Sequence, residues 1–139
     1  MEVKVQKLHP AAVIPSQAHP GDAGWDLVTP EEFTLQPGER KTIGLGFAVA
    51  FESGHVALIR DRSGLGSKGL HTLAGVIDAS YRGEWKIVFL NTSSEPMSLK
   101  VGERVAQCLF LPIAGVEMSE TKNLEETSRG SGGFGSTGQ

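Results

Sequence analysis

The chain has 139 residues, enough for one domain with a single core, and it carries a formal net charge of −3 with a pI of about 5.8. This balance supplies no basic field that would attract nucleic acid or an anionic membrane. No run approaches about 18 apolar residues, and the N-terminal segment lacks the apolar stretch of a signal peptide. We therefore expect a soluble cytoplasmic protein without a nucleic-acid or membrane partner.

Short apolar segments that alternate with small or polar residues predict strands along most of the chain. The clearest runs from Ile43 to Phe51, where every odd residue is large and apolar. Turn sequences separate such segments at roughly ten-residue spacing, and no window has a helical apolar pattern. We predict an all-β domain, a jelly-roll-like barrel or sandwich. Its expected strands span residues 3–5, 33–35, 43–51, 56–59, 73–77, 85–90, 97–101 and 105–113.

The strand expected at residues 105–113 is apolar on both faces. A strand of a small antiparallel sandwich normally has one solvated face, so either another copy of the chain or an internal loop must cover the second face. Gln107 interrupts this run and needs a hydrogen-bond partner. Cys108, the single cysteine, is expected to be a buried, unreactive thiol.

Several familiar nucleotide and catalytic motifs are excluded by their context. Two segments, residues 64–69 and 130–135, match Gly-x-Gly-x-x-Gly, but neither lies between a strand and a helix, as a dinucleotide site requires. The Walker pattern and the Gly-x-Ser-x-Gly elbow are absent, and the four histidines have no metal-ligand spacing.

Clusters of polar residues and glycine recur where the predicted strands end. Asp22 and Asp26 flank Gly24, in a turn that either aims a carboxylate at a hydrated cation or is an ordinary turn. Residues 62–69 form either an anion nest or an exposed hairpin turn. Asp78 follows an apolar run, so we expect it to be partly desolvated, with a raised pKa suited to a general base, unless it only caps a hairpin.

Five segments in fixed order resemble the motifs of the trimeric dUTP diphosphatase (dUTPase) family: DAGWDL, RSGLGSKG, GVIDASYRGE, GERVAQ and RGSGGFGSTG. The resemblance implies a jelly-roll homotrimer with active sites shared between chains. It also implies Mg²⁺-assisted hydrolysis of dUTP to dUMP and pyrophosphate, which limits uracil in DNA and supplies dUMP for thymidylate synthesis. Residues 1–126 would form the β core, and residues 127–139 a flexible glycine-rich arm that closes over an active site.

The resemblance further implies a role for individual residues. Asp78 would be the base that activates water for in-line attack at the α-phosphorus, Gln107 would hold a phosphate or a metal-bound water, and Arg129 would act like an arginine finger. Tyr81 would pack against the deoxyribose, and Asp26 would hold the hydration shell of a Mg²⁺ bound mainly by the substrate phosphates. The other expected substrate contacts are Arg62, Ser63, Gly64, Gly75, Val76, Ile77, Phe134, Gly135, Ser136 and Thr137.

Two positions depart from the family pattern. Asp61 stands where many members carry a neutral residue, which adds a negative charge near the phosphates. Thr72 stands where many bacterial relatives have an asparagine, which leaves a side-chain contact to uracil open. Two alternatives also remain: a dCTP deaminase or bifunctional deaminase–diphosphatase of the same fold, and a non-catalytic trimeric nucleotide-binding module.

Overall fold

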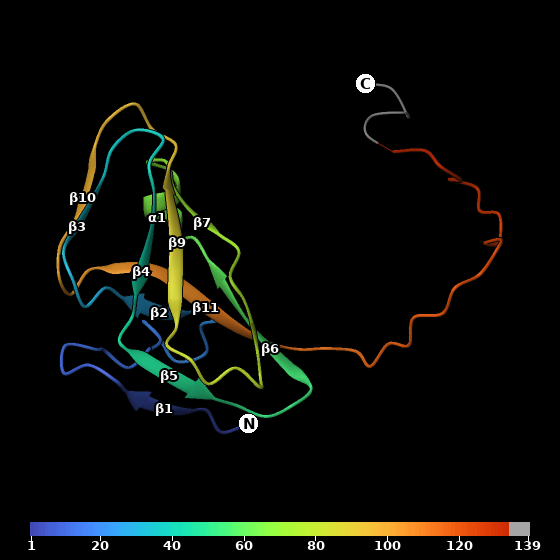
Figure 1. The fold of residues 1–139 in the computed structure, drawn as a ribbon, viewed down its shortest axis with the longest axis horizontal. Coiled ribbons are helices and arrows are strands. Elements are labelled where there is room, and N and C mark those ends of the chain that lie inside the picture. The colour runs from blue at the N-terminus through green and yellow to red at the C-terminus, as the bar shows by residue number, and fades with distance from the viewer. Residues whose placement is uncertain (134–139) are drawn as a thin grey trace.

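The computed structural model describes residues 1–133, and almost all of its regular structure is β (Figure 1). Its single short helix, α1 (Ser63–Gly66), is one turn long. No helix in the described part of the chain is long and apolar enough to cross a membrane. The strands are β1 (Lys4–Lys7), β2 (Trp25–Val28), β3 (Phe33–Leu35), β4 (Arg40–Gly44), β5 (Phe47–Ala50), β6 (His55–Arg60), β7 (Leu70–Leu73), β8 (Val76–Asp78), β9 (Lys86–Asn91), β10 (Met97–Leu99) and β11 (Arg104–Pro112).

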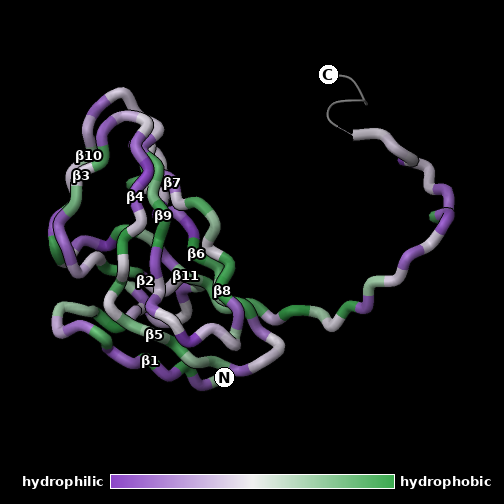
Figure 2. Tube along the Cα trace, in the orientation of Figure 1, coloured by the Kyte–Doolittle hydropathy of each residue, from purple (hydrophilic) through white to green (hydrophobic). Residues whose placement is uncertain are grey.

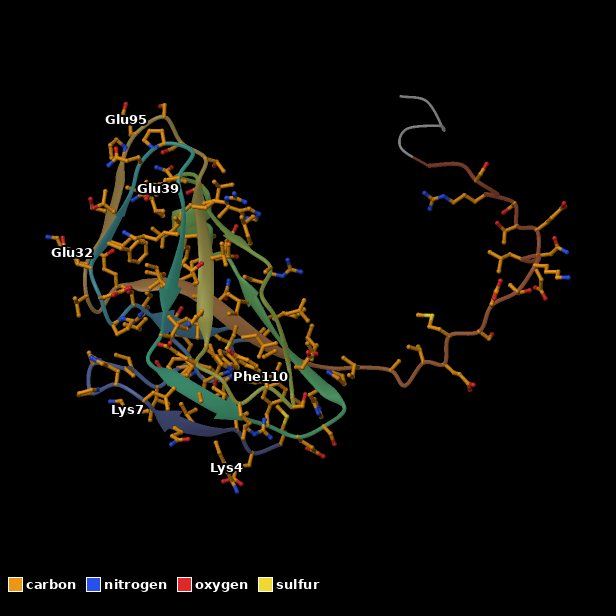
Figure 3. All side chains as sticks on the ribbon, in the orientation of Figure 1. Lys4, Lys7, Glu32, Glu39, Glu95 and Phe110 are labelled. Carbon is orange, nitrogen blue, oxygen red and sulfur yellow. The ribbon has the colours of Figure 1, made fainter. Side chains whose placement is uncertain are left out.

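The strands form four small antiparallel sheets, ordered β1-β5, β3-β10, β2-β11-β6-β8 and β4-β9-β7. Their inner faces enclose one core in which Trp85, Phe47 and Phe89 are the largest fully buried side chains. The exposed positions of β1 are polar, and Figure 3 shows Lys4 and Lys7 extending outward from this strand. The prediction of an all-β, jelly-roll-like domain is confirmed.

Two of the expected strands are each divided in the structure. The run from Ile43 to Phe51 breaks at Gly46, whose φ of 72° is left-handed, and the chain there changes from β4 to β5. Residues 73–77 divide at Ala74 and Gly75, with φ of 61° and 92°. The predictions of single strands were wrong because alternation reports which side chains are buried and not whether the backbone stays extended.

The Asp-rich turn expected at residues 22–27 is also only half correct. Asp22 lies in a turn, but the chain from Trp25 onward is strand β2, which pairs with β11. Leu27 is fully buried in the core, and Asp26 on the same strand points to the opposite face. Asp22 therefore lies in the turn before the strand, and Asp26 lies on the strand itself, which is a rigid element.

Strand β11 lies between β2 and β6. The predictions made from the sequence for two of its residues, Gln107 and Cys108, are both confirmed. The Gln107 amide donates to the backbone oxygen of Asp61 at 2.9 Å. Cys108 is buried, and this burial raises the pKa of its thiol to about 12. Beyond Cys108 the strand is less covered: Leu111 is 40% exposed.

After β11 the chain leaves the body. Figure 1 shows residues 114–133 running away from the sheets, and Figure 2 shows hydrophobic residues where this segment departs. Val116, Met118 and Leu124 on it are 75%, 90% and 86% exposed. Apolar side chains this exposed are typical of a surface that another chain covers.

Candidate active site

An open cleft of about 610 Å³ lies beside the β2-β11-β6 part of the largest sheet. Polar and glycine residues from three separate parts of the sequence line it. Among the predicted site residues, this cleft brings together Asp26, Arg62, Ser63, Gly64 and Gln107, and its other lining residues are Ala18, Asp22, Ala23 and Gly24.

Two arginines hold the Asp26 carboxylate at the edge of this cleft. Nε of Arg62 lies 3.0 Å from Asp26 Oδ1, and Nη1 of Arg104 lies 3.3 Å from Asp26 Oδ2. Arg62 also donates through Nη1 to the backbone oxygen of Arg104 at 3.2 Å. Two positive charges around one negative charge leave the group with a net charge of +1, which suits an anionic ligand such as a phosphate chain.

Arg104 received no functional assignment from the sequence. The sequence places Arg104 just before the strand that is apolar on both faces, but it does not reveal the ion pair with Asp26, which lies 78 positions earlier in the chain. β2 and β11 become neighbours only in the folded sheet. The segment from Arg62 also differs from the expected hairpin turn, because its first residues form the single helical turn α1. The anion nest stays a prediction.

Gly24 allows Gln107 to face the cleft. A Cβ atom at residue 24 would overlap Oε1 of Gln107. We expect Gly24→Ala to displace the Gln107 amide and to break its hydrogen bond to Asp61, at a cost of about 1 kcal/mol in folding free energy. The substitution should raise the KM for the ligand of this cleft by about 3- to 10-fold, the equivalent of one such hydrogen bond. Steady-state kinetics and thermal melting check this result, and an unchanged KM would show that Gln107 does not contact the ligand.

A second pocket, of about 250 Å³, is lined by the segment from Ala74 to Tyr81. The predicted residues Gly75, Val76, Ile77, Asp78 and Tyr81 all lie on its wall, together with Ala74, Glu84 and Lys86. Gly75 is required in its backbone conformation, because its φ is 92° and a Cβ atom would come within 3.0 Å of the backbone oxygen of Ile59. Gly75 in turn accepts a hydrogen bond from the Ile59 backbone N–H at 2.8 Å.

Tyr81 lies in the turn after β8, where the sequence predicted a turn. Its backbone N–H donates to the Asp78 backbone oxygen at 3.0 Å, and its hydroxyl donates to the Glu84 backbone oxygen at 3.0 Å. A side chain at Gly83 would overlap the tyrosine ring. Tyr81 is 45% exposed, so part of the side chain is open to a ligand.

Asp78 is exposed, and the expectation of a partly desolvated carboxylate is wrong for the single chain. β8 is an edge strand that pairs only with β6 among the described residues, and its outward positions face solvent. The apolar run before Asp78 supplies one buried residue, Ile77, and no wall around the carboxylate.

The two pockets do not converge within one chain. Asp78 pairs with Val56 near the start of β6, whereas Gln107 pairs with Arg60 at its end. At a rise of about 3.3 Å per residue, these positions are separated by about 13 Å along the sheet. A group that acts on a phosphate must lie within a few ångströms of it, so the Asp78 of one chain and the cleft of the same chain cannot act on one phosphate in this arrangement.

Arg129 contacts neither pocket. Its Nε donates to the backbone oxygen of Gly132 at 2.9 Å, within the segment that has left the body. The remaining predicted arm residues, Phe134, Gly135, Ser136 and Thr137, lie outside the described residues.

The residues around the cleft bear on how a divalent cation would bind. No group of three or more His, Cys, Asp or Glu side chains that could hold a metal occurs within residues 1–133. Asp22 and Asp26 supply carboxylates on the cleft wall, and both oxygens of Asp26 already face arginines. This donor set fits a Mg²⁺ that takes most of its ligands from water and phosphate, and not from a protein cage.

Comparisons with known proteins agree on one family. A sequence model of the dUTPase family matches residues 11–138. The deoxyuridine 5'-triphosphate nucleotidohydrolase of Nocardia farcinica is 46% identical over 140 residues, covering 98% of this chain and 85% of the relative. The protein of the same name from Nautilia profundicola is 44% identical over 142 residues, covering 100% of both chains.

Solved structures of dUTPases have the same fold as this chain and a related sequence. A mutant dUTPase of Staphylococcus bacteriophage 80alpha with dUpNHpp has a TM-score of 0.91 and 29% identity, covering 99% of each chain. A mutant dUTPase from phage phi11 of S. aureus, described with a structural Mg(II) ion, has a TM-score of 0.83 and 26% identity, covering 91% of this chain and 100% of that one. The family match and the full-length relatives together establish that this chain belongs to the dUTPase family.

Proposed function

We propose that the protein hydrolyses dUTP to dUMP and pyrophosphate, which limits uracil incorporation into DNA and supplies dUMP. The observation that carries this proposal is the pair of pockets. One has a polar wall that includes Asp26 with its two arginine partners, a group whose net charge of +1 suits phosphates, and the other combines an exposed carboxylate with a half-exposed tyrosine ring. The relatives at 46% and 44% identity are named for hydrolysis of the same nucleotide.

The active form is proposed to be a homotrimer whose sites are shared between chains. The separation of about 13 Å along β6 between the register positions of Asp78 and Gln107 supports this arrangement. A neighbouring chain that brings its β8 against the cleft would place a carboxylate beside the phosphates. The exposed Leu111, Val116 and Met118 supply apolar surface for such contacts.

Within a shared site, Asp78 acts as the general base. Its carboxylate takes a proton from a water molecule, which attacks the α-phosphorus in line with the departing pyrophosphate. The second pocket binds the nucleoside: backbone groups of Gly75, Val76 and Ile77 read the uracil edge, and Tyr81 packs on the deoxyribose and leaves no room for a 2′-hydroxyl.

The cleft holds the phosphate chain. Arg62 and Ser63 contact phosphate oxygens, the backbone of Gly64 approaches closely, and the Gln107 amide donates to an oxygen or to a metal-bound water. Asp26 would hold the hydration shell of a Mg²⁺ bound to the phosphates, and such an ion would supply positive charge beside the departing pyrophosphate.

The chain is proposed to work as two regions, a β core over residues 1–126 and an arm over residues 127–139. The arm crosses to the site of another chain, where Arg129 contacts the phosphates, Phe134 stacks on uracil, and Gly135, Ser136 and Thr137 wrap the phosphate chain. A segment that leaves the body after β11 has the freedom to reach a neighbour (Figure 1).

The test is a product assay with dUTP, dCTP, dTTP and UTP in the presence of Mg²⁺, with nucleotides and pyrophosphate resolved. We expect dUMP and pyrophosphate from dUTP alone. Deamination of dCTP would reassign the chain to a deaminase or bifunctional enzyme of this fold. Absence of turnover with all four nucleotides would leave the nucleotide-binding module as the function to pursue.

A further inference from the structure

The loop between β6 and α1 carries a carboxylate that binds β7. Asp61 Oδ1 accepts hydrogen bonds from the backbone N–H of Thr72 at 2.7 Å and from its hydroxyl at 2.6 Å. Asp61 Oδ2 lies 2.6 Å from Nδ1 of His71. These contacts join two segments that are ten residues apart in the chain and that form the two sides of the α1 turn.

The same contacts keep Asp61 ionised. Burial acts to raise the pKa of its carboxyl, but the hydrogen bonds from Thr72 and His71, together with the charge of His71, outweigh this effect and hold the pKa below its ordinary value of 3.8. At neutral pH the negative charge of Asp61 therefore faces β7 and its donors, and not the phosphate cleft.

The backbone of the same residue supports the cleft. The Asp61 carbonyl accepts from Nε2 of Gln107, and the next residue, Arg62, pairs with Asp26. Ser63 follows as the first residue of α1. The side chain of Asp61 thus connects the segment of residues 61–63 to β7. The main chain of Asp61, together with Arg62 and Ser63, faces the ligand.

Asp61 and Thr72 are also the two positions at which the chain departs from the family pattern, and in the structure they contact each other. We propose that Asp61 and Thr72 form a positioning pair that fixes residues 61–63 against β7, so that Arg62, Ser63 and Gln107 face the phosphates of the substrate. This inference rests on the proposed phosphate-binding role of the cleft. It also gives the Thr72 hydroxyl a partner within the protein.

The variants Asp61→Ala and Thr72→Val test the pair. Loss of the contact between Asp61 and Thr72 loosens the phosphate contacts of Arg62, Ser63 and Gln107. These contacts are made in both the ground state and the transition state. We therefore expect Asp61→Ala to raise the KM for dUTP by about 10-fold, with a change in kcat of less than about 3-fold. Thr72→Val should have a smaller effect in the same direction. In the double variant the two effects should be less than additive, because both remove the same contact.

Two further measurements separate positioning from simple stabilisation. Affinity for dUpNHpp should fall in parallel with the rise in KM, whereas inhibition by deoxyuridine, which has no phosphate, should stay unchanged. Asp61→Asn keeps an acceptor oxygen for the Thr72 N–H, so its KM should remain within about 3-fold of that of the original chain.

Glu39→Ala is the matched control. Glu39 accepts the backbone N–H of Gln36 at 2.7 Å, so its loss also breaks a carboxylate–backbone contact. It adjoins β4, which lies on the other side of β9 from β7 (Figure 1). We expect Glu39→Ala to lower the melting temperature without changing the KM.

The outcomes distinguish this inference from the proposed function. If Asp61→Ala lowers the melting temperature but leaves KM and dUpNHpp affinity within 2-fold of those of Glu39→Ala, the positioning pair is refuted. Arg62→Ala serves as the reference for the cleft itself. An unchanged KM in Arg62→Ala would instead contradict the phosphate assignment on which the inference rests.

Discussion

Replacement of Asp78 by asparagine is expected to lower kcat for dUTP by about 10²- to 10⁴-fold, the contribution of a positioned general base. Asparagine has nearly the same shape as aspartate but cannot accept the proton of the attacking water. Because the side chain is exposed on the edge strand β8, the folding free energy should change by less than about 0.5 kcal/mol. Stopped or steady-state product assays, with dUpNHpp binding measured alongside, check this result.

Glu95→Gln provides the control for this substitution. It makes the same carboxylate-to-amide change at an exposed residue at the end of the body away from β8 (Figures 2 and 3). Its kcat should equal that of the original chain. If Asp78→Asn turns over dUTP as fast as Glu95→Gln does, Asp78 is not the general base. If Asp78→Asn no longer binds dUpNHpp, Asp78 contributes to substrate binding.

Replacement of Arg129 by alanine is expected to lower kcat by about 10³-fold or more, if the residue acts as arginine fingers do in other phosphoryl-transfer enzymes. Stability should not change, since the only side-chain hydrogen bond of Arg129 in the described structure is to Gly132 on the same segment. Arg129→Lys keeps the charge but lacks the planar fork, so it should recover only part of the activity. A full rate in Arg129→Ala would contradict the finger role.

A mixture of the two inactive variants tests whether the sites are shared. In a trimer that takes Asp78 and Arg129 of each site from different chains, co-assembly of Asp78→Asn with Arg129→Ala at equal amounts restores both groups in about a quarter of the sites. The mixture should therefore recover about a quarter of the original activity after joint refolding. No recovery from confirmed mixed trimers would place both residues of a site on one chain.

The sequence predicted the β class because alternation of large and small residues is a local property. Ile43, Leu45, Phe47 and Val49 are all buried, as their spacing indicated. The breaks between strands were missed where the backbone takes positive φ. Gly46 and Gly75 are two of many glycines in the chain, and Ala74 carries no local signal for its conformation.

For the candidate site, too, local features could be predicted from the sequence and long-range contacts could not. Residue types, motif order and the resemblance predicted the groups, and five of them line one cleft. The contacts of Arg104 with Asp26, and of Thr72 with Asp61, were not visible, because each joins residues that become neighbours only through strand pairing or loop packing. The exposure of Asp78 was also missed, since burial depends on which strand forms the edge of a sheet.

By itself, then, the sequence predicted a β domain of the dUTPase family and named the side chains that we propose carry its chemistry. The tertiary structure decided how those side chains are distributed: Arg62 and Gln107 at one end of β6, and Asp78 near the other. The physical reason is that side-chain chemistry and local periodicity are encoded residue by residue, whereas register along a sheet depends on all the strands that pack together. A separation of about 13 Å along one strand follows only from that register.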